Sequence, residues 1–223
     1  MIHVITKIER PSRDVIEPFQ HLGVATVHEA SGRKGAVDPA IKPIANGVRL
    51  CGPAFTVQCQ PGDNLMLHKA LERAQPGDVL VATVGGCHEG GYWGGLMGTS
   101  GQARRLGGLA IDGCVRDSAE LIQMGFPIFC RGFAIRGTAK SVLGLINHPT
   151  VFGGVIVHPG DLILGDDDGI VVVARVECEG VLEKSLERKR AEEKKADQLR
   201  AGISSVELNK LGKVFEALGL VEE

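Results

Sequence analysis

The chain is poor in several features that mark particular classes of protein. Aromatic residues make up only 4% of the 223 residues, which argues against a surface built for aromatic stacking. The formal net charge of −2 gives no reason to expect a nucleic-acid partner. No apolar run reaches membrane-spanning length, and the first residues lack a basic-then-apolar signal pattern. These absences predict a cytoplasmic protein with neither a membrane nor a nucleic-acid partner.

Paired cysteine motifs are also absent. The six cysteines include no Cys-x-x-Cys pair, so we expect reduced core residues rather than disulfides or a zinc site. Cys114 lies two residues before Arg116, but no His stands near it in a recognisable nucleophile pattern. The cysteines are Cys51, Cys59, Cys87, Cys114, Cys130 and Cys178.

What the sequence does contain is an alternation of apolar strand runs and helical segments, followed by hairpins and a charged helix. Helices are expected over 14–22, from about 26, and over 65–74, 96–105, 118–124 and much of 176–211. Strands are expected over 48–51, 54–59, 79–84, 108–111, 127–130, 155–157, 161–164 and 170–173. The pattern predicts an α/β core domain over 1–174 and a C-terminal helical arm over 175–223.

The most informative motif is a glycine-rich turn, GGLMGTS at 94–100, that opens a helix. One strand later, DGCVRD at 112–117 ends in Arg116 and Asp117. A helix N-terminus and an Arg side chain both favour a bound carboxylate or phosphate, and a carboxylate suits Mg²⁺ or Mn²⁺. The two segments therefore predict an anion site beside a divalent cation. Spacing alone fits equally well with a surface ion pair beside an ordinary glycine turn.

The three aspartates of GDDDG (165–169) have a simpler explanation. They lack the spacing and the terminal Glu of an EF-hand loop. We expect a turn between two strands of a hairpin.

The charged segment 183–195 mixes both signs and holds few apolar residues. Such a helix is either solvated or laid on a neighbouring subunit, and composition alone favours the solvated helix.

Several motifs together resemble one family. They are ATVHEA (25–30) with GR (32–33), PGDN (61–64), GYWG (91–94), DGCVRD (112–117) and GDDDG (165–169). In order and spacing they resemble the 4-hydroxy-4-methyl-2-oxoglutarate / 4-carboxy-4-hydroxy-2-oxoadipate aldolases, a group that includes the regulator of ribonuclease activity A-like proteins. The resemblance implies an α/β/β sandwich like the swivelling phosphohistidine domain, assembled as a homotrimer or homohexamer.

The resemblance also implies a reaction and a set of site residues. The aldolases cleave a carbon–carbon bond of a small 2-oxo acid with the help of Mg²⁺ or Mn²⁺. By resemblance, Asp117 binds the metal and Arg116 stabilises the developing enolate. The amides of Leu96 and Met97 hold the pyruvyl carboxylate, and Asn64, His68 and Lys140 line the pocket. Glu192 matches a glutamate that reaches the site of the adjacent subunit, which favours the intersubunit arm.

One position departs from the aldolases. They carry an aspartate immediately before the residue that matches Leu96, and here that residue is Gly95. In the family, this aspartate and the intersubunit glutamate hold the water proposed as the acid/base. Glu89 or His88, in the same glycine-rich loop, could supply a substitute, although both also suit a plain polar loop.

Three classes of function therefore stay open. The first is a metal-dependent lyase, either an aldolase or an oxaloacetate decarboxylase, and the retained Arg116 and Asp117 favour it. The second is a non-catalytic protein that binds a ribonuclease. The third is a related enzyme whose substrate differs because Gly95 makes room for it.

Overall fold

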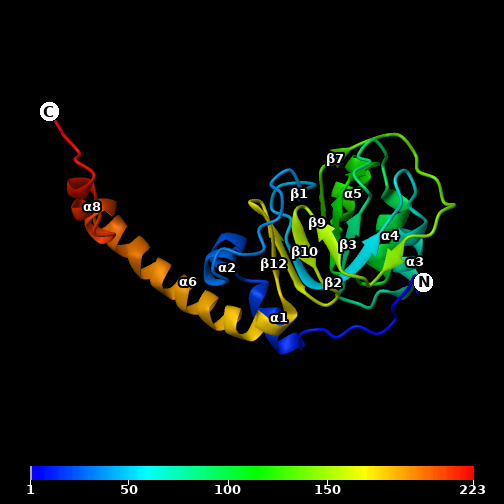
Figure 1. Cartoon of the computed structure of the whole chain (residues 1–223), viewed down its shortest axis with the longest axis horizontal. Coiled ribbons are helices and arrows are strands. Elements are labelled where there is room, and N and C mark those ends of the chain that lie inside the picture. The colour runs from blue at the N-terminus through cyan, green and yellow to red at the C-terminus, as the bar shows by residue number, and fades with distance from the viewer. Residues whose placement is uncertain (1) are drawn as a thin grey trace.

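The computed structural model describes residues 2–223, which form a mixed α/β body with a long C-terminal helix leading away from it (Figure 1). The helices are α1 (Arg13–Phe19), α2 (Val24–Ala30), α3 (Leu65–Arg73), α4 (Gly95–Ala103), α5 (Ser118–Met124), α6 (Cys178–Arg200), α7 (Ser205–Leu208) and α8 (Gly212–Ala217), with a 3₁₀ turn η1 (Arg175–Glu177). None of these helices, within the described residues, is long and apolar enough to cross a membrane.

The main sheet joins eight strands in the order β1-β6-β4-β3-β2-β11-β12, with β8 added beside β2. Strands β2, β3, β4 and β6 are parallel, and the remaining neighbours are antiparallel. These strands are β1 (Lys42–Pro43), β2 (Leu50–Gln58), β3 (Val79–Thr83), β4 (Gly108–Asp112), β6 (Ile128–Cys130), β8 (Leu145–Ile146), β11 (Leu162–Asp166) and β12 (Gly169–Val173). Two small sheets pair β5 (Cys114–Val115) with β7 (Gly132–Phe133), and β9 (Thr150–Phe152) with β10 (Val155–Val157).

The two ends of the main sheet curve toward each other, so that the sheet nearly closes into a barrel. The segment just before β1 reaches β12, where Ala36 bridges to Val171 and the Val37 N–H donates to the Ile170 carbonyl at 3.1 Å. The mixed α/β class is confirmed. The specific likeness to the swivelling phosphohistidine domain stays a prediction.

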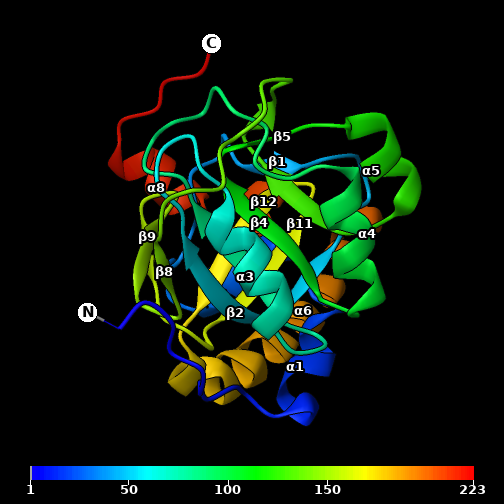
Figure 2. The same cartoon turned by 90° about the vertical axis from the view of Figure 1, so that its right-hand side faces the viewer.

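The side chains of β3 alternate between the two faces of the main sheet and so belong to two separate hydrophobic cores. Leu80 and Ala82 belong to the core under α3, α4 and α5, whereas Val79 and Val81 belong to the core inside the curved sheet. All four are fully buried. Because successive side chains of a strand point to opposite faces, a strand buried on both faces reads as a continuous apolar run. Figure 2 shows α3, α4 and α5 lying together over the sheet.

The two strands expected over 48–51 and 54–59 are one strand, and that prediction is wrong in detail. β2 changes partners near Pro53: residues Leu50 to Pro53 pair with β11, and Ala54 to Gln58 pair with β3. The proline thus lies where one ladder ends and the next begins. This position tolerates a residue without an N–H, which a sequence reading takes for a break.

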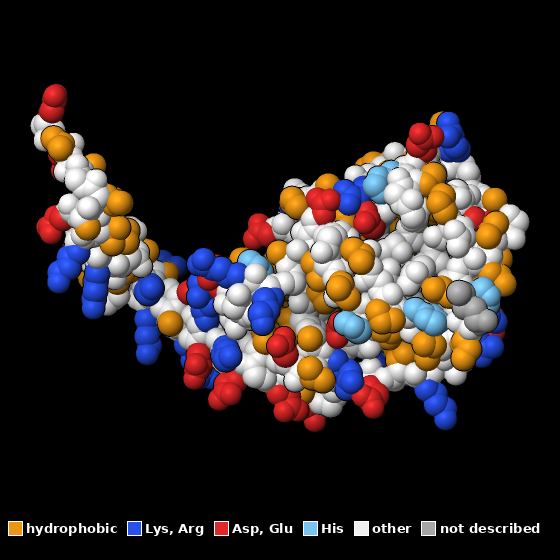
Figure 3. Space-filling view, in the orientation of Figure 1, with side chains coloured by type: hydrophobic (Ala, Val, Ile, Leu, Met, Phe, Trp, Pro, Cys, Tyr) orange, Lys and Arg blue, Asp and Glu red, His pale blue; other side chains and the backbone are white. Residues whose placement is uncertain are grey.

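The long helix α6 begins in the chain's own core. Cys178, Val181 and Ser185 are buried against a cluster that includes residues of α1, α2, β11 and β12. Beyond that half, the helix is exposed, and charged side chains of both signs gather over it (Figure 3). Only the outer part of the segment therefore has the character of an arm.

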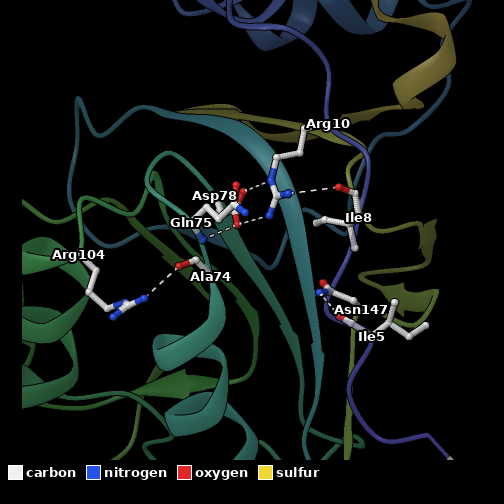
Figure 4. A network of polar contacts seen from close by, with 8 residues as sticks. All are labelled: Ile5, Ile8, Arg10, Ala74, Gln75, Asp78, Arg104 and Asn147. Carbon is white, nitrogen blue, oxygen red and sulfur yellow. Dashed lines mark hydrogen bonds and ion pairs between the residues drawn. The ribbon is translucent and has the colours of Figure 1, made fainter.

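The N-terminal segment is fastened to the amino end of β3 by a buried ion pair (Figure 4). Arg10 donates twice to the carboxylate of Asp78, at 2.7 Å each, and Asp78 also accepts from the Gln75 N–H at 2.8 Å. A second hydrogen bond joins the same N-terminal segment to the body: the side-chain amide of Asn147 donates to the Ile5 carbonyl at 2.8 Å. Since Asp78 is fully buried, these bonds supply the partners that a charge in that position requires.

The aspartate run forms the expected turn. Asp166 pairs with Gly169 at the end of the β11–β12 hairpin, and its carboxylate accepts from the N–H groups of Val24 and Asp168 at 3.0 Å each. Within residues 2–223 there is no group of three or more His, Cys, Asp or Glu side chains placed to hold a metal.

The cysteines are free thiols, as expected. Burial is the main cause that raises the pKa of Cys59 and of Cys178 to about 12. Burial also raises the pKa of Cys114, which argues against its use as a nucleophile.

Candidate functional site

The glycine-rich turn and the Arg-Asp pair meet at the N-terminus of α4. The Arg116 N–H donates to the Trp93 carbonyl at 2.8 Å, which ties the segment after β5 to the turn before α4. The Asp117 carboxylate accepts from the Gly95 N–H at 3.1 Å, and its Oδ2 lies 3.8 Å from Nε of Arg116. Both side chains are about half exposed, at 46%. The two motifs therefore form one site.

Gly94 is required by this close approach. A Cβ at this position would lie 2.5 Å from Oδ2 of Asp117 and 3.2 Å from Nε of Arg116. Any side chain here would push the carboxylate away from the helix N-terminus.

Asp117 has an unusual backbone conformation. It is the N-cap of α5 and lies in the left-handed region, with φ 56° and ψ 39°. Non-glycine residues rarely adopt this conformation, although Asp and Asn tolerate it better than others do. Such a strained residue often marks a functional site, because the surrounding structure must hold it in place.

A cavity of about 210 Å³ opens beside this pair. It is lined by seven of the residues that the sequence predicted: Asn64, His68, Leu96, Met97, Arg116, Asp117 and Lys140. Sequence reasoning missed Tyr92, Gly137 and Thr138, which also line it. The position of Thr138 two residues before Lys140 is the one signal that could have found it.

Two polar atoms of the cavity lining are buried without a partner. Asn64 is 5% exposed; its Nδ2 donates to the Tyr92 carbonyl at 2.8 Å, while no described residue donates a hydrogen bond to its Oδ1. Nε2 of His68 is likewise without a partner among residues 2–223. Burial and then the nearby Lys140 lower the pKa of His68, and both therefore favour the neutral ring. Because buried polar atoms are normally hydrogen-bonded, these two are available to a polar ligand or to an ordered water.

Asp63 positions the loop that carries Lys140. Its carboxylate accepts from the N–H groups of Ser141 at 2.6 Å, Leu65 at 2.8 Å and Val142 at 3.1 Å. Burial would raise the pKa of Asp63, but these hydrogen bonds outweigh it and lower the pKa. Asp63 thus supplies the capping bond at α3, although Asn64 occupies the N-cap position.

The two amides expected to hold a carboxylate differ in availability. The Met97 N–H already donates to the Gly94 carbonyl at 3.0 Å. The Leu96 N–H, in the first turn of α4, has no acceptor within the helix and is open to a ligand.

Two predicted site residues lie outside this cavity in their own chain. Glu89 is exposed and accepts from Arg136 at 2.6 Å. Glu192 lies on α6, where it pairs with Arg188 at 2.7 Å and accepts from the Thr26 hydroxyl at 3.1 Å. The structure therefore brings together the anion-binding and cation-binding candidates but neither of these glutamates.

The donor set suits a hard divalent cation. The site offers the Asp117 carboxylate, and Mg²⁺ commonly binds proteins through one or two carboxylates while keeping several waters. Zinc sites are built mainly from several Cys and His ligands, and the described residues hold no group of three or more His, Cys, Asp or Glu side chains around Asp117. Asp117 would therefore hold Mg²⁺ or Mn²⁺ largely through water.

Comparison with known proteins places the chain in a family. Residues 24–172 match the family model "RraA-like: Aldolase/RraA". A Halalkalibacterium halodurans protein named "Putative 4-hydroxy-4-methyl-2-oxoglutarate aldolase" is 34% identical over 86% of this chain and 92% of its own length. A Burkholderia multivorans protein of the same name is 32% identical over 70% of this chain and 96% of its own length.

Solved structures agree with this assignment. A Pseudomonas syringae pv. tomato protein has a TM-score of 0.80 at 27% identity, over 91% of this chain and 98% of that one. Streptomyces coelicolor RraAS2, described as an unusual member of the RNase ES inhibitor RraA protein family, has a TM-score of 0.77 at 28% identity, over 85% and 99%. The family thus holds both an aldolase name and an inhibitor name, and this chain belongs to the RraA-like family.

Proposed function

We propose that the chain is a metal-dependent lyase that cleaves 4-hydroxy-2-oxo acids to pyruvate and a second oxo acid, and that also decarboxylates oxaloacetate. The observation that carries this proposal is the unpaired Asn64 Oδ1 in a cavity bounded by Arg116, Asp117 and the N-terminus of α4. Such a cavity suits a small ligand with a carboxylate at one end and a hydroxyl at the other. The names of the aldolase relatives support the same class of substrate.

Each part of the proposed reaction is assigned to a group that borders the cavity. The Leu96 N–H and the positive end of α4 would bind the substrate carboxylate. The guanidinium of Arg116 would stabilise the negative charge that develops on the 2-oxo oxygen as the bond breaks. Oδ1 of Asn64 would accept a hydrogen bond from the substrate hydroxyl. When bound at Asp117, Mg²⁺ or Mn²⁺ would supply a Lewis acid that polarises the 2-oxo group.

The outer part of α6 supports an assembly of several chains. Among the described residues, this part of α6 contacts the body near α2, where Lys189 donates to the His21 carbonyl at 3.5 Å and Glu192 accepts from the Thr26 hydroxyl at 3.1 Å, and it also contacts α7. Beyond it, Val214 and Phe215 of α8 and Leu218 after α8 are exposed apolar residues. We infer that this arm lies on a neighbouring subunit of a homotrimer or homohexamer and brings Glu192 to that subunit's cavity. Size measurement in solution tests this inference, and a monomer would contradict it.

A panel of substrates tests the proposed reaction. Pyruvate release is measured from 4-hydroxy-2-oxo acids and from oxaloacetate, with and without Mg²⁺ or Mn²⁺. Metal-dependent release from both supports the lyase, and release from oxaloacetate alone narrows the function to decarboxylation. Release from neither, with pyruvate failing to bind, refutes the proposal.

A second candidate is a non-catalytic protein that binds a ribonuclease. The likeness to RraAS2 over most of both chains favours it, as does the absence of a side chain at Gly95. Binding to a ribonuclease together with no turnover in the substrate panel would make this candidate the better one.

A further inference from the structure

Among the described residues that line the cavity, Asp117 is the one carboxylate, although aldol cleavage needs a group that moves a proton. Asp117 is itself bonded to the Gly95 N–H, and Glu89 is paired with Arg136. Glu192 is paired with Arg188 on the far side of the chain. Within the same chain, a carboxylate that moves the proton must therefore come from another position.

Glu120 occupies the space that a side chain at position 95 would fill. A Cβ on Gly95 would lie 2.5 Å from Oε1 of Glu120 and closer still to Oε2. Gly95 is helical, at the first position of α4, so the glycine here does not serve a left-handed turn. Its lack of a side chain instead leaves room for a carboxylate delivered by α5.

Three features make Glu120 suited to act at this place. It stands one helical turn after Asp117 on α5, so both carboxylates border Gly95. It is exposed, and no hydrogen bond or ion pair joins its carboxylate to any residue of 2–223. The packing of α5 against α4 holds its backbone fixed, with Leu121 fully buried beside it.

We propose that Glu120 is the proton-handling carboxylate of this site and replaces, from α5, a side chain that position 95 lacks. The inference rests on the proposed function. In cleavage, a water held by Glu120 takes the proton of the C4 hydroxyl and passes a proton on to the Glu120 carboxylate while the C3–C4 bond breaks. The electron pair of that bond forms the enolate, and C4 becomes a carbonyl. Glu120 then gives a proton back through water to C3, which gives pyruvate. Glu120 acts through water and is thus a positioning residue.

Exchange of the pyruvate methyl protons with D₂O, followed by NMR, isolates this proton transfer from bond cleavage. Glu120→Gln and Glu120→Ala should lower the exchange rate about 10²–10⁴-fold, the usual worth of general acid/base assistance. Affinities for Mn²⁺ and for pyruvate, measured by calorimetry, should stay within about threefold, since Asp117, Arg116 and α4 are retained. Glu17→Gln, an exposed glutamate on α1, is the matched control and should exchange like the parent protein.

A double variant tests the position itself. Gly95→Asp combined with Glu120→Ala moves the carboxylate onto α4 and should recover much of the lost exchange. Gly95→Ala combined with Glu120→Ala fills the same space without a charge and should recover none. Equal rates in these two double variants, or normal exchange in Glu120→Gln, would overturn the proposal for Glu120. If the unaltered protein neither binds pyruvate nor exchanges its methyl protons, the proposed function fails instead, and the role of Glu120 with it.

Discussion

Replacing Asp117 by Asn separates the chemistry of this residue from its structural role. Asparagine keeps an oxygen that can accept from the Gly95 N–H at 3.1 Å, and it tolerates φ 56° at least as well as aspartate does. The side chain is 46% exposed, so the lost charge weakens a partly hydrated hydrogen bond. We expect a stability change of less than about 1 kcal/mol, the net worth of one such bond.

Two companion variants show whether the backbone strain is real. Asp117→Ala loses the same hydrogen bond and also puts a less tolerant residue in the left-handed region, so it should cost about 1–2 kcal/mol. For a chain of this size, that corresponds to a fall in Tm of about 2–8 °C. Asp117→Gly loses the bond but relieves the strain, so its Tm should lie above that of Asp117→Ala.

The functional effect should be the same in all three variants. Each lacks the carboxylate, so Mn²⁺ affinity should fall at least about 100-fold, because even the outer partners of a metal are worth about 10–100-fold. Calorimetry measures Mn²⁺ binding, and thermal unfolding measures stability on the same samples. Unchanged Mn²⁺ affinity in Asp117→Asn would refute the assignment of Asp117 as the cation ligand. A Tm of Asp117→Gly below that of Asp117→Ala would refute the reasoning on strain.

Three further predictions concern the rest of the site. Arg116→Lys should lower the rate of pyruvate release about 10²–10³-fold, since an ammonium does not reproduce the planar guanidinium donors; a rate within threefold of the parent would contradict this. Asp63→Asn should lower the free energy of unfolding at pH 7 by about 1–3 kcal/mol, measured by urea unfolding. Because folding lowers the pKa of Asp63, its contribution is complete above the unfolded value of 3.8 and is lost as pH falls through the folded pKa. The difference between the two proteins should therefore shrink below about pH 4, and a difference that is constant with pH would exclude the ionised carboxylate as its cause. Removing residues 191–223 should lower activity far more than Tm, because Cys178, Val181 and Ser185 keep the start of α6 in the core; a large fall in Tm would show that the outer helix stabilises the body.

The strands and turns that depend on local sequence patterns were predictable from the sequence. The continuous apolar run of β3 and the glycine turn before α4 gave the correct elements, because burial on both faces and tight turns leave clear marks in the residues. The meeting of the Gly94 turn with Arg116 and Asp117 was predicted from a glycine turn that opens a helix and from the strand that follows this helix.

What depends on packing between distant elements was not predictable. The prediction divided β2 into two strands because Pro53 resembles a strand break. The sequence does not show that β2 changes its partner strand at this residue. The burial of Val181 and Ser185 was not predictable from the charged composition of α6. The approach of Glu120 to Gly95 results from the packing of α4 on α5, which no spacing within either helix shows.

The most direct test of the proposed reaction is the exchange of pyruvate methyl protons with D₂O in the unaltered protein, with and without Mg²⁺. This measurement requires no knowledge of the natural substrate, because an aldolase that protonates the enolate of pyruvate reversibly exchanges these protons with the solvent. The proposed function predicts exchange that requires Mg²⁺ and that is lost in Asp117→Asn. Absence of exchange with Mg²⁺ present, or equal exchange in Asp117→Asn, would contradict it.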